Sequence, residues 1–166
     1  AQALGTAVAA CPALEELGLE LNPTLGADGG IEAIAAGLAA SATLRRLNLT
    51  CCAIGAPGAE ALEAALTSCT SLARLGVAPN GPRAGGRAPI ARAVAGSASL
   101  EHLDASDNEL GEGGAAVLAA AVGSSASLRS LMVYANQMGT AGVEALVASV
   151  GACATLGACD ARWNGV

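Results

Sequence analysis

The chain has 166 residues, of which 53% are hydrophobic, with one Tyr, one Trp and no Phe, and its net charge is −6. This length suits a single domain with a buried core. An acidic chain lacks the basic stripe that general nucleic-acid binding needs, so we expect no nucleic-acid partner. The longest alanine-rich apolar stretch, residues 115–122, is much shorter than the about 18 to 20 residues of a membrane-spanning helix, so we expect no membrane association.

The chain opens with a helical pattern in which Leu4 and Val8 are four residues apart. Residues 14–22 then read L-x-x-L-x-L-x-x-N, which predicts a short strand because alternate side chains point to opposite faces. A glycine-marked turn follows, and after it a second helical pattern with Ile34 and Leu38 on one face. The same order of strand, turn and helix recurs to the end of the chain.

The recurrence has a fixed period. Aligned on the leucine that opens each strand, the units begin at residues 14, 44, 72, 100, 128 and 156, in one step of 30 and four of 28. Such a period is the signature of a solenoid. We therefore expect one domain, 1–166, with a partial repeat at 1–13, full repeats at 14–43, 44–71, 72–99, 100–127 and 128–155, and a partial repeat at 156–166. Both ends fall within a repeat and lack a polar cap, so we expect a window from a longer array.

An asparagine closes the strand pattern in five of the six units, and Cys52 stands there in the second unit. An amide carries both donors and acceptors, so it can pair with backbone groups of the turn. Repeated at one position, it predicts a ladder of side chains that keeps the buried loop backbone hydrogen-bonded. The predicted ladder is formed by Asn22, Asn80, Asn108, Asn136 and Asn164.

Three of the turns share a further pattern, a hydrophobic residue and glycine followed three residues later by another glycine. They are Ile54-Gly55-x-x-Gly58, Leu110-Gly111-x-x-Gly114 and Met138-Gly139-x-x-Gly142. With this turn and the repeated LxxLxLxxN, the chain resembles leucine-rich repeat proteins of the ribonuclease-inhibitor-like class over essentially its whole length. The resemblance implies an α/β fold, a right-handed horseshoe-shaped solenoid with a parallel β-sheet on the concave face and helices on the convex face. The unit from residue 72 departs most, because Pro82 and Arg83 replace the first pair of the turn.

Outward strand side chains define the predicted binding surface, since in-register strands would align them in rows about 4.8 Å apart. The first row is Glu16, Arg46, Arg74, His102, Ser130 and Ala158; the second is Gly18, Asn48, Gly76, Asp104, Met132 and Asp160; the third is Glu20, Thr50, Ala78, Ser106, Tyr134 and Arg162. We expect a cationic column of Arg46, Arg74 and His102, bordered by Glu16. We also expect an aromatic corner formed by Met132, Tyr134 and Trp163. The predicted partner-binding residues are Arg46, Arg74, His102, Asp104, Met132, Tyr134, Arg162 and Trp163. The alternative is that Arg46 pairs with Glu16 and that the aromatic residues are incidental.

Sequence signals for catalysis are weak. The chain has no lysine, so its glycine-rich stretches cannot form a P-loop, and no GxSxG motif occurs. His102, Asp104 and Asp107 have irregular spacing, which is more typical of a solvated sheet edge than of a metal site. We therefore expect no enzyme activity, no cofactor and no metal.

The cysteines indicate the compartment. Cys11, Cys69 and Cys153 each lie three residues before a strand leucine, where serine stands in other units, so they are interpreted as small packing residues and not as a disulfide framework. Free thiols favour a reducing compartment, here the cytoplasm, with the nucleus or a cilium as alternatives.

Together these patterns predict a non-catalytic scaffold for protein–protein interaction, which binds a protein partner on the concave sheet face and the adjoining loops. The resemblance leaves two alternatives open. One is a GTPase-activating protein similar to the activator of the Ran GTPase, and the other is the sensing arm of a nucleotide-binding immune-type receptor. No stretch matches either alternative beyond the repeat framework, so no functional residue is transferred from them.

Overall fold

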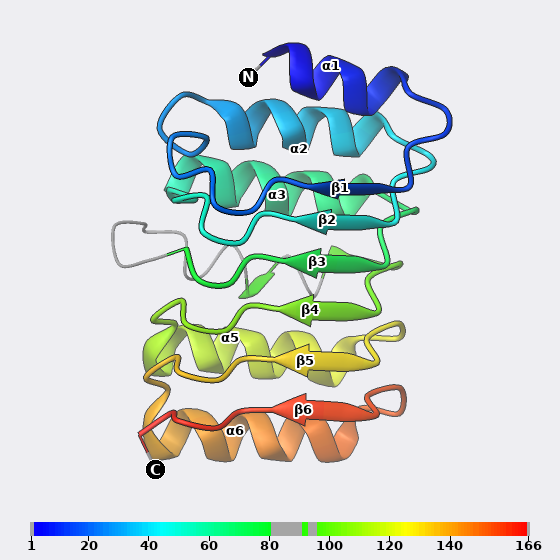
Figure 1. Cartoon of the computed structure of the whole chain (residues 1–166). Helices are drawn as coiled ribbons and strands as arrows, with labels where there is room; N and C mark the ends of the chain where they lie inside the picture. The colour runs from blue at the N-terminus through cyan, green and yellow to red at the C-terminus, as the bar shows by residue number, and fades with distance from the viewer. Residues whose placement is uncertain (1, 81–90, 93–95, 166) are drawn as a thin grey trace.

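The computed structural model describes residues 2–80, 91–92 and 96–165. Strands and helices alternate along the described chain (Figure 1). The strands are β1 (Glu16–Gly18), β2 (Arg46–Asn48), β3 (Arg74–Gly76), β4 (His102–Asp104), β5 (Ser130–Met132) and β6 (Ala158–Asp160). The helices are α1 (Gln2–Ala10), α2 (Gly30–Ala40), α3 (Ala56–Ser68), α5 (Gly111–Ser124) and α6 (Gly139–Ala152).

The six strands form one parallel sheet in chain order, and the helices lie behind it as a second layer (Figure 1). Equivalent residues pair from strand to strand, so that Arg74 lies between Arg46 and His102. The α/β class and the parallel sheet backed by helices are thereby confirmed. The same register confirms the first two predicted rows of outward residues.

The core fills the space between the sheet and the helices. The central leucines of the strands, such as Leu75 and Leu103, are only 4% and 3% exposed. Leu118 and Val122 of α5 are buried in the same cluster, as their spacing on one helix face predicts. Burial of such side chains is the main driving force for stacking the units.

Small residues let neighbouring helices approach closely. A Cβ atom added to Gly5 of α1 would collide with the Ala33 carbonyl of α2, and one added to Gly37 would collide with the Gly5 carbonyl. The high alanine and glycine content therefore serves close helix packing. Among the described residues, no helix is both long and apolar enough to cross a membrane.

The third predicted row is partly wrong. Ala78 and Ser106 were expected to point outward, but they are 5% and 0% exposed. Each strand ends two residues before this row, where the chain leaves the pleated surface. Asp107 and Trp163, which follow Ser106 and Arg162, have a positive φ, and Pro79 follows Ala78. The departures expected at Pro82 and Arg83 lie outside the described residues.

Candidate partner-binding face

The asparagines predicted as a ladder hold the strand exits in place. The Asn136 Oδ1 atom accepts hydrogen bonds from the N–H groups of Asn108 and Leu110, at 3.0 and 3.3 Å. Its Nδ2 donates to the carbonyls of Ala105 and Val133, both at 3.0 Å. The amides of Asn80, Asn108, Asn136 and Asn164 each link their own unit to the preceding one, and Asn136 is fully buried. The backbone at the exits is therefore fixed, which keeps the outer face of the sheet in register.

Cys52 occupies the ladder position of the second unit. Its thiol donates to the Leu19 carbonyl at 3.0 Å, which is the type of bond that an asparagine amide makes elsewhere in the ladder. The Asn22 backbone N–H lies against the sulfur and acts to lower the pKa, but burial has the larger effect and raises the pKa of the thiol. The buried thiol therefore stays protonated at neutral pH and can act as a donor.

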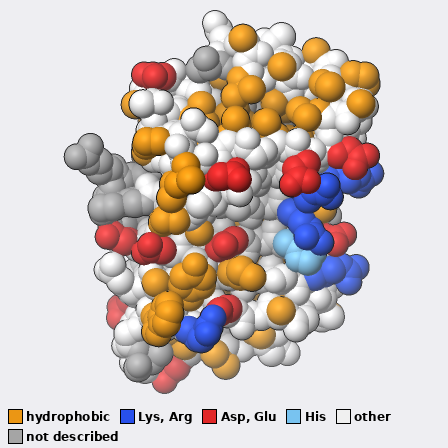
Figure 2. Space-filling model, viewed as in Figure 1, with side chains coloured by type: hydrophobic (Ala, Val, Ile, Leu, Met, Phe, Trp, Pro, Cys, Tyr) orange, Lys and Arg blue, Asp and Glu red, His pale blue; other side chains and the backbone are white. Residues whose placement is uncertain are grey.

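The cationic column consists of Arg46, Arg74 and His102, which lie side by side at the start of β2, β3 and β4. Figure 2 shows basic side chains gathered along this edge of the sheet face. The Arg46 Nε atom pairs with Glu16 Oε2 at 2.8 Å, so the ion pair anticipated as the alternative is present. Among the described residues, the Arg74 side chain has neither an ion pair nor a hydrogen bond.

Sequence reasoning missed one member of this edge. The Arg129 Nε atom lies 3.5 Å from Glu101 Oε2, and the same carboxylate oxygen lies 4.0 Å from His102 Nε2. Arg129 directly precedes β5, one residue outside the predicted rows. Extending the row comparison by one residue toward the strand starts would have found it.

A hollow of about 360 Å³ lies over the middle of the sheet face. Gly76 contributes no side chain there, whereas Asn48 and Asp104 flank it on the neighbouring strands. Five of the predicted residues line this hollow, namely Arg46, Arg74, His102, Asp104 and Met132. The glycine between two polar residues in the second row was the sequence signal for this hollow, and sequence reasoning did not use it.

The predicted aromatic corner is a second group, in which Arg162 joins Tyr134 and Trp163, whereas Met132 lines the hollow. The two rings meet edge to face, with centres 6.1 Å apart, and the Arg162 guanidinium carbon lies 5.8 Å from the centre of the Trp163 ring. Arg162 also binds Asp160 through two hydrogen bonds, which lower the pKa of the aspartate and raise that of the arginine. The Trp163 side chain is 76% exposed. These contacts hold an aromatic surface open to solvent.

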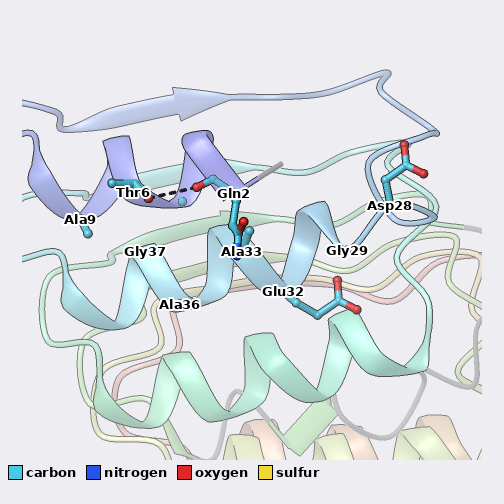
Figure 3. Close-up of a pocket in the computed structure, with 10 residues that line it drawn as sticks. Gln2, Thr6, Ala9, Asp28, Gly29, Glu32, Ala33, Ala36 and Gly37 are labelled. Carbon is cyan, nitrogen blue, oxygen red and sulfur yellow. Dashed lines mark hydrogen bonds between the residues drawn. The ribbon is translucent and has the colours of Figure 1, made fainter.

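A larger hollow, of about 730 Å³, lies on the helix side between α1 and α2 (Figure 3). Small residues such as Gly37 and Ala33 line most of it, with the carboxylates of Asp28 and Glu32 at one end. Close packing of small residues accounts for its shape. Its lining lacks the converging set of different polar groups that marks a ligand site.

The residues considered for metal binding do not converge. His102 and Asp104 line the hollow on the sheet face, but Asp107 follows the strand and is exposed. No group of three or more His, Cys, Asp or Glu that could hold a metal ion occurs in the part of the chain that the structure describes. All six cysteines are free thiols.

Residues 40–62, which run from the end of α2 through β2 into α3, match a family model described as Leucine Rich repeat. A search of curated protein sequences found no match. The tropomodulin C-terminal domain of Caenorhabditis elegans superposes with a TM-score of 0.73, at 15% sequence identity and over 91% of each chain. The ribonuclease-inhibitor-like class stays a prediction, because neither likeness is specific to it. The matched repeat and the shared architecture show that the chain has the leucine-rich-repeat fold.

Proposed function

We propose that the chain is a non-catalytic interaction scaffold that binds a protein partner on the exposed face of its sheet. The observation that carries this proposal is the hollow beside the cationic column, where side chains from neighbouring strands converge. Leucine-rich repeats generally offer an extended sheet face to other proteins. The free cysteines support a reducing compartment, with the cytoplasm preferred over the nucleus or a cilium.

The residue types on this face support a protein partner. Arginine, tyrosine and tryptophan most often anchor protein interfaces, because they bury a large area and still make polar contacts. Trp163 and Met132 are 76% and 44% exposed, so both are available for burial by a partner. The hollow and the aromatic corner lie on the same face, and one partner surface can contact both.

The test is capture of a partner by the whole chain and by a variant in which Arg46, Arg74, Tyr134 and Trp163 are replaced by alanine. We expect the variant to lose at least about tenfold in affinity, since interface anchors contribute about 2 kcal/mol or more each. The matched control replaces Arg92 and Val147, exposed residues on the helix side, by alanine. If the folded variant captures the same partner as tightly as the control does, the proposal is wrong.

The two alternatives remain open to direct assays. A GTPase activator would accelerate GTP hydrolysis by a small GTPase, whereas a scaffold binds without changing any rate. The sensing-arm alternative requires a nucleotide-binding module in the parent protein. Neither alternative has a supporting observation on the described surface.

A further inference from the structure

One recurrent hydrogen bond organises the outer face of the sheet. In three strands the side-chain oxygen of the second-row residue accepts a hydrogen bond from the backbone N–H two residues later, as in an Asx turn. The pairs are Asn48 Oδ1 with the Thr50 N–H at 3.1 Å, Asp104 Oδ1 with the Ser106 N–H at 3.0 Å, and Asp160 Oδ1 with the Arg162 N–H at 3.2 Å. These N–H groups leave the parallel ladder at the strand exit, so each needs another acceptor.

β3 lacks this bond. Gly76 stands at the second-row position and has no side chain to offer. Among the residues that the structure describes, the Ala78 N–H has no hydrogen-bond acceptor. Ala78 is only 5% exposed, and a buried N–H without a partner is both rare and costly. An acceptor oxygen from another molecule, placed over Gly76, would complete the pattern of β2 and β4.

The surroundings of Gly76 favour a negatively charged acceptor. Arg74 begins the same strand two residues earlier, on the same face, about 7 Å away along the chain, which is within the reach of an arginine side chain. It has no ion pair among the described residues. Asn48 Oδ1 and the Thr50 hydroxyl oxygen lie 3.0 and 3.6 Å from the position that a Cβ atom on Gly76 would take, so an amide and a hydroxyl border the hollow at this point.

The chain itself shows a carboxylate at the equivalent position of β1. Gly18 is the other glycine of the second row, and the Glu20 carboxylate folds over it, with Oε2 2.9 Å from where a Cβ on Gly18 would lie. In β3 the residue equivalent to Glu20 is Ala78, which has no carboxylate. Gly18 is therefore covered by a carboxylate of the chain itself, whereas Gly76 is bordered by the neutral amide of Asn48, with Oδ1 3.0 Å from its Cβ position, and lines the hollow.

We propose that the hollow over Gly76 binds one carboxylate, from an Asp or Glu side chain of the partner protein. That carboxylate accepts hydrogen bonds from the Ala78 N–H and the Arg74 guanidinium. Glu16 and Asp104 also line the hollow, and their charges oppose a second carboxylate, so the site selects a single acidic side chain and not an acidic run. This inference rests on the proposed function and names the partner group that the sheet face recognises.

The test follows the amide resonances of the whole ¹⁵N-labelled chain during titration with a capped Ala-Ala-Glu-Ala-Ala peptide. We expect a saturable downfield shift of the Ala78 amide proton, and about tenfold weaker binding of the same peptide with Gln in place of Glu, because a charged acceptor makes the stronger bond. Equal responses to the two peptides, or no response at Ala78, would overturn the proposal. If acetate binds as tightly as the Glu peptide, or inorganic phosphate binds more tightly, the assignment to a protein carboxylate is wrong.

Variants separate the site from general charge attraction. Gly76→Asn supplies the chain's own acceptor, as Asn48 does in β2, so the Ala78 proton should already be shifted and the peptide response should fall at least about tenfold. Asp104→Asn keeps an acceptor for the Ser106 N–H and removes a repelling charge, so peptide affinity should rise. Arg74→Gln should weaken binding, whereas Arg92→Gln on the helix side should not.

These variants also cover the case in which Gly76→Asn fails to fold, because Arg74→Gln and Asp104→Asn alter only exposed or half-buried groups. Equal weakening by Arg74→Gln and Arg92→Gln would overturn the proposal. The titration is independent of partner capture. If the sheet face captures a protein while the Ala78 amide resonance does not shift in the peptide titration, this inference fails and the scaffold function stands.

Discussion

On the inner side of the sheet, leucine stands at the middle of β1 to β5, whereas the residue beside it on the outer side changes from strand to strand. The inward-facing residues have the same structural role in every unit. They fill the core and pair the backbone at the strand exit. The outer positions meet no shared demand, so Arg46, Gly76 and Met132 can occupy neighbouring strands. The repeated side therefore specifies the fold, and the varied side carries the information about a partner.

The largest expected effect comes from the ladder. Asn136→Ala removes both acceptor bonds and the amide donors from a fully buried position, which leaves several backbone groups unpaired. We expect the free energy of unfolding to fall by about 3 to 6 kcal/mol in a urea titration. The matched control is Asn22→Ala, whose amide is exposed and bonds only within its own unit, with an expected loss below about 1 kcal/mol. Equal losses for the two variants would mean that the ladder does not depend on burial.

Packing behind the sheet gives the second effect. Leu103→Ala, at a position only 3% exposed, should lower the free energy of unfolding by about 2 to 5 kcal/mol, because it leaves a cavity in a close-packed core. Met132→Ala on the outer face of the neighbouring strand should change it by less than about 0.5 kcal/mol. Denaturant titration of both variants compares the two faces directly. A negligible loss for Leu103→Ala would show that the inner and outer faces have been assigned the wrong way round.

Cys52 is the one ladder position without an amide, and Cys52→Asn should raise the free energy of unfolding by about 1 kcal/mol at pH 7. The gain should also depend on pH. Burial raises the pKa of the Cys52 thiol above its ordinary value of 9.0 in the folded chain. The neutral thiol therefore contributes stability in full below pH 9, and this contribution is lost as the pH rises through the folded pKa.

The measurement is the urea midpoint of both proteins between pH 7 and pH 10.5. Above pH 9, the urea midpoint of the wild type should drop further below that of Cys52→Asn. Cys159, whose pKa burial also raises, is present in both proteins and cancels in the difference. If the difference between the two urea midpoints did not change with pH, the assigned role of the thiol would be contradicted.

The fold was predictable from the sequence because the units repeat the same buried leucines and, in all but the second unit, the same residue type at the strand exit. The spacing of Leu75, Leu103 and the ladder asparagines predicts the strands, their register and the parallel order without any knowledge of the turns. The boundaries of the outer face were less predictable. Ser106 fits the alternating pattern of an outward residue, but the strand ends at Asp104 and a positive φ at Asp107 redirects the chain. Alternation alone does not show where a strand stops.

The candidate site was predictable only in part, for a different reason. Charged and aromatic residues such as Arg74 and Trp163 stand out in a sequence, so they were found. Gly76 was missed, because its contribution is an absent side chain and an N–H at Ala78 that has no acceptor among the described residues. That contribution is visible only beside the hydrogen bonds of Asn48 and Asp104 on the neighbouring strands.

The smallest expected effect belongs to the ion pair on the outer face. Glu16→Gln removes the partner of Arg46, but both side chains are about half exposed or more, at 64% and 46%. Water and salt screen such a pair, so we expect the free energy of unfolding to change by less than about 0.5 kcal/mol, and by less still in 0.5 M salt. The substitution also leaves Arg46 without its counter-charge at the rim of the hollow, so affinity for the Glu peptide should rise. A loss of stability above about 1.5 kcal/mol would mean that this face, like the inner one, is constrained by folding, and its variation could then no longer be attributed to a partner.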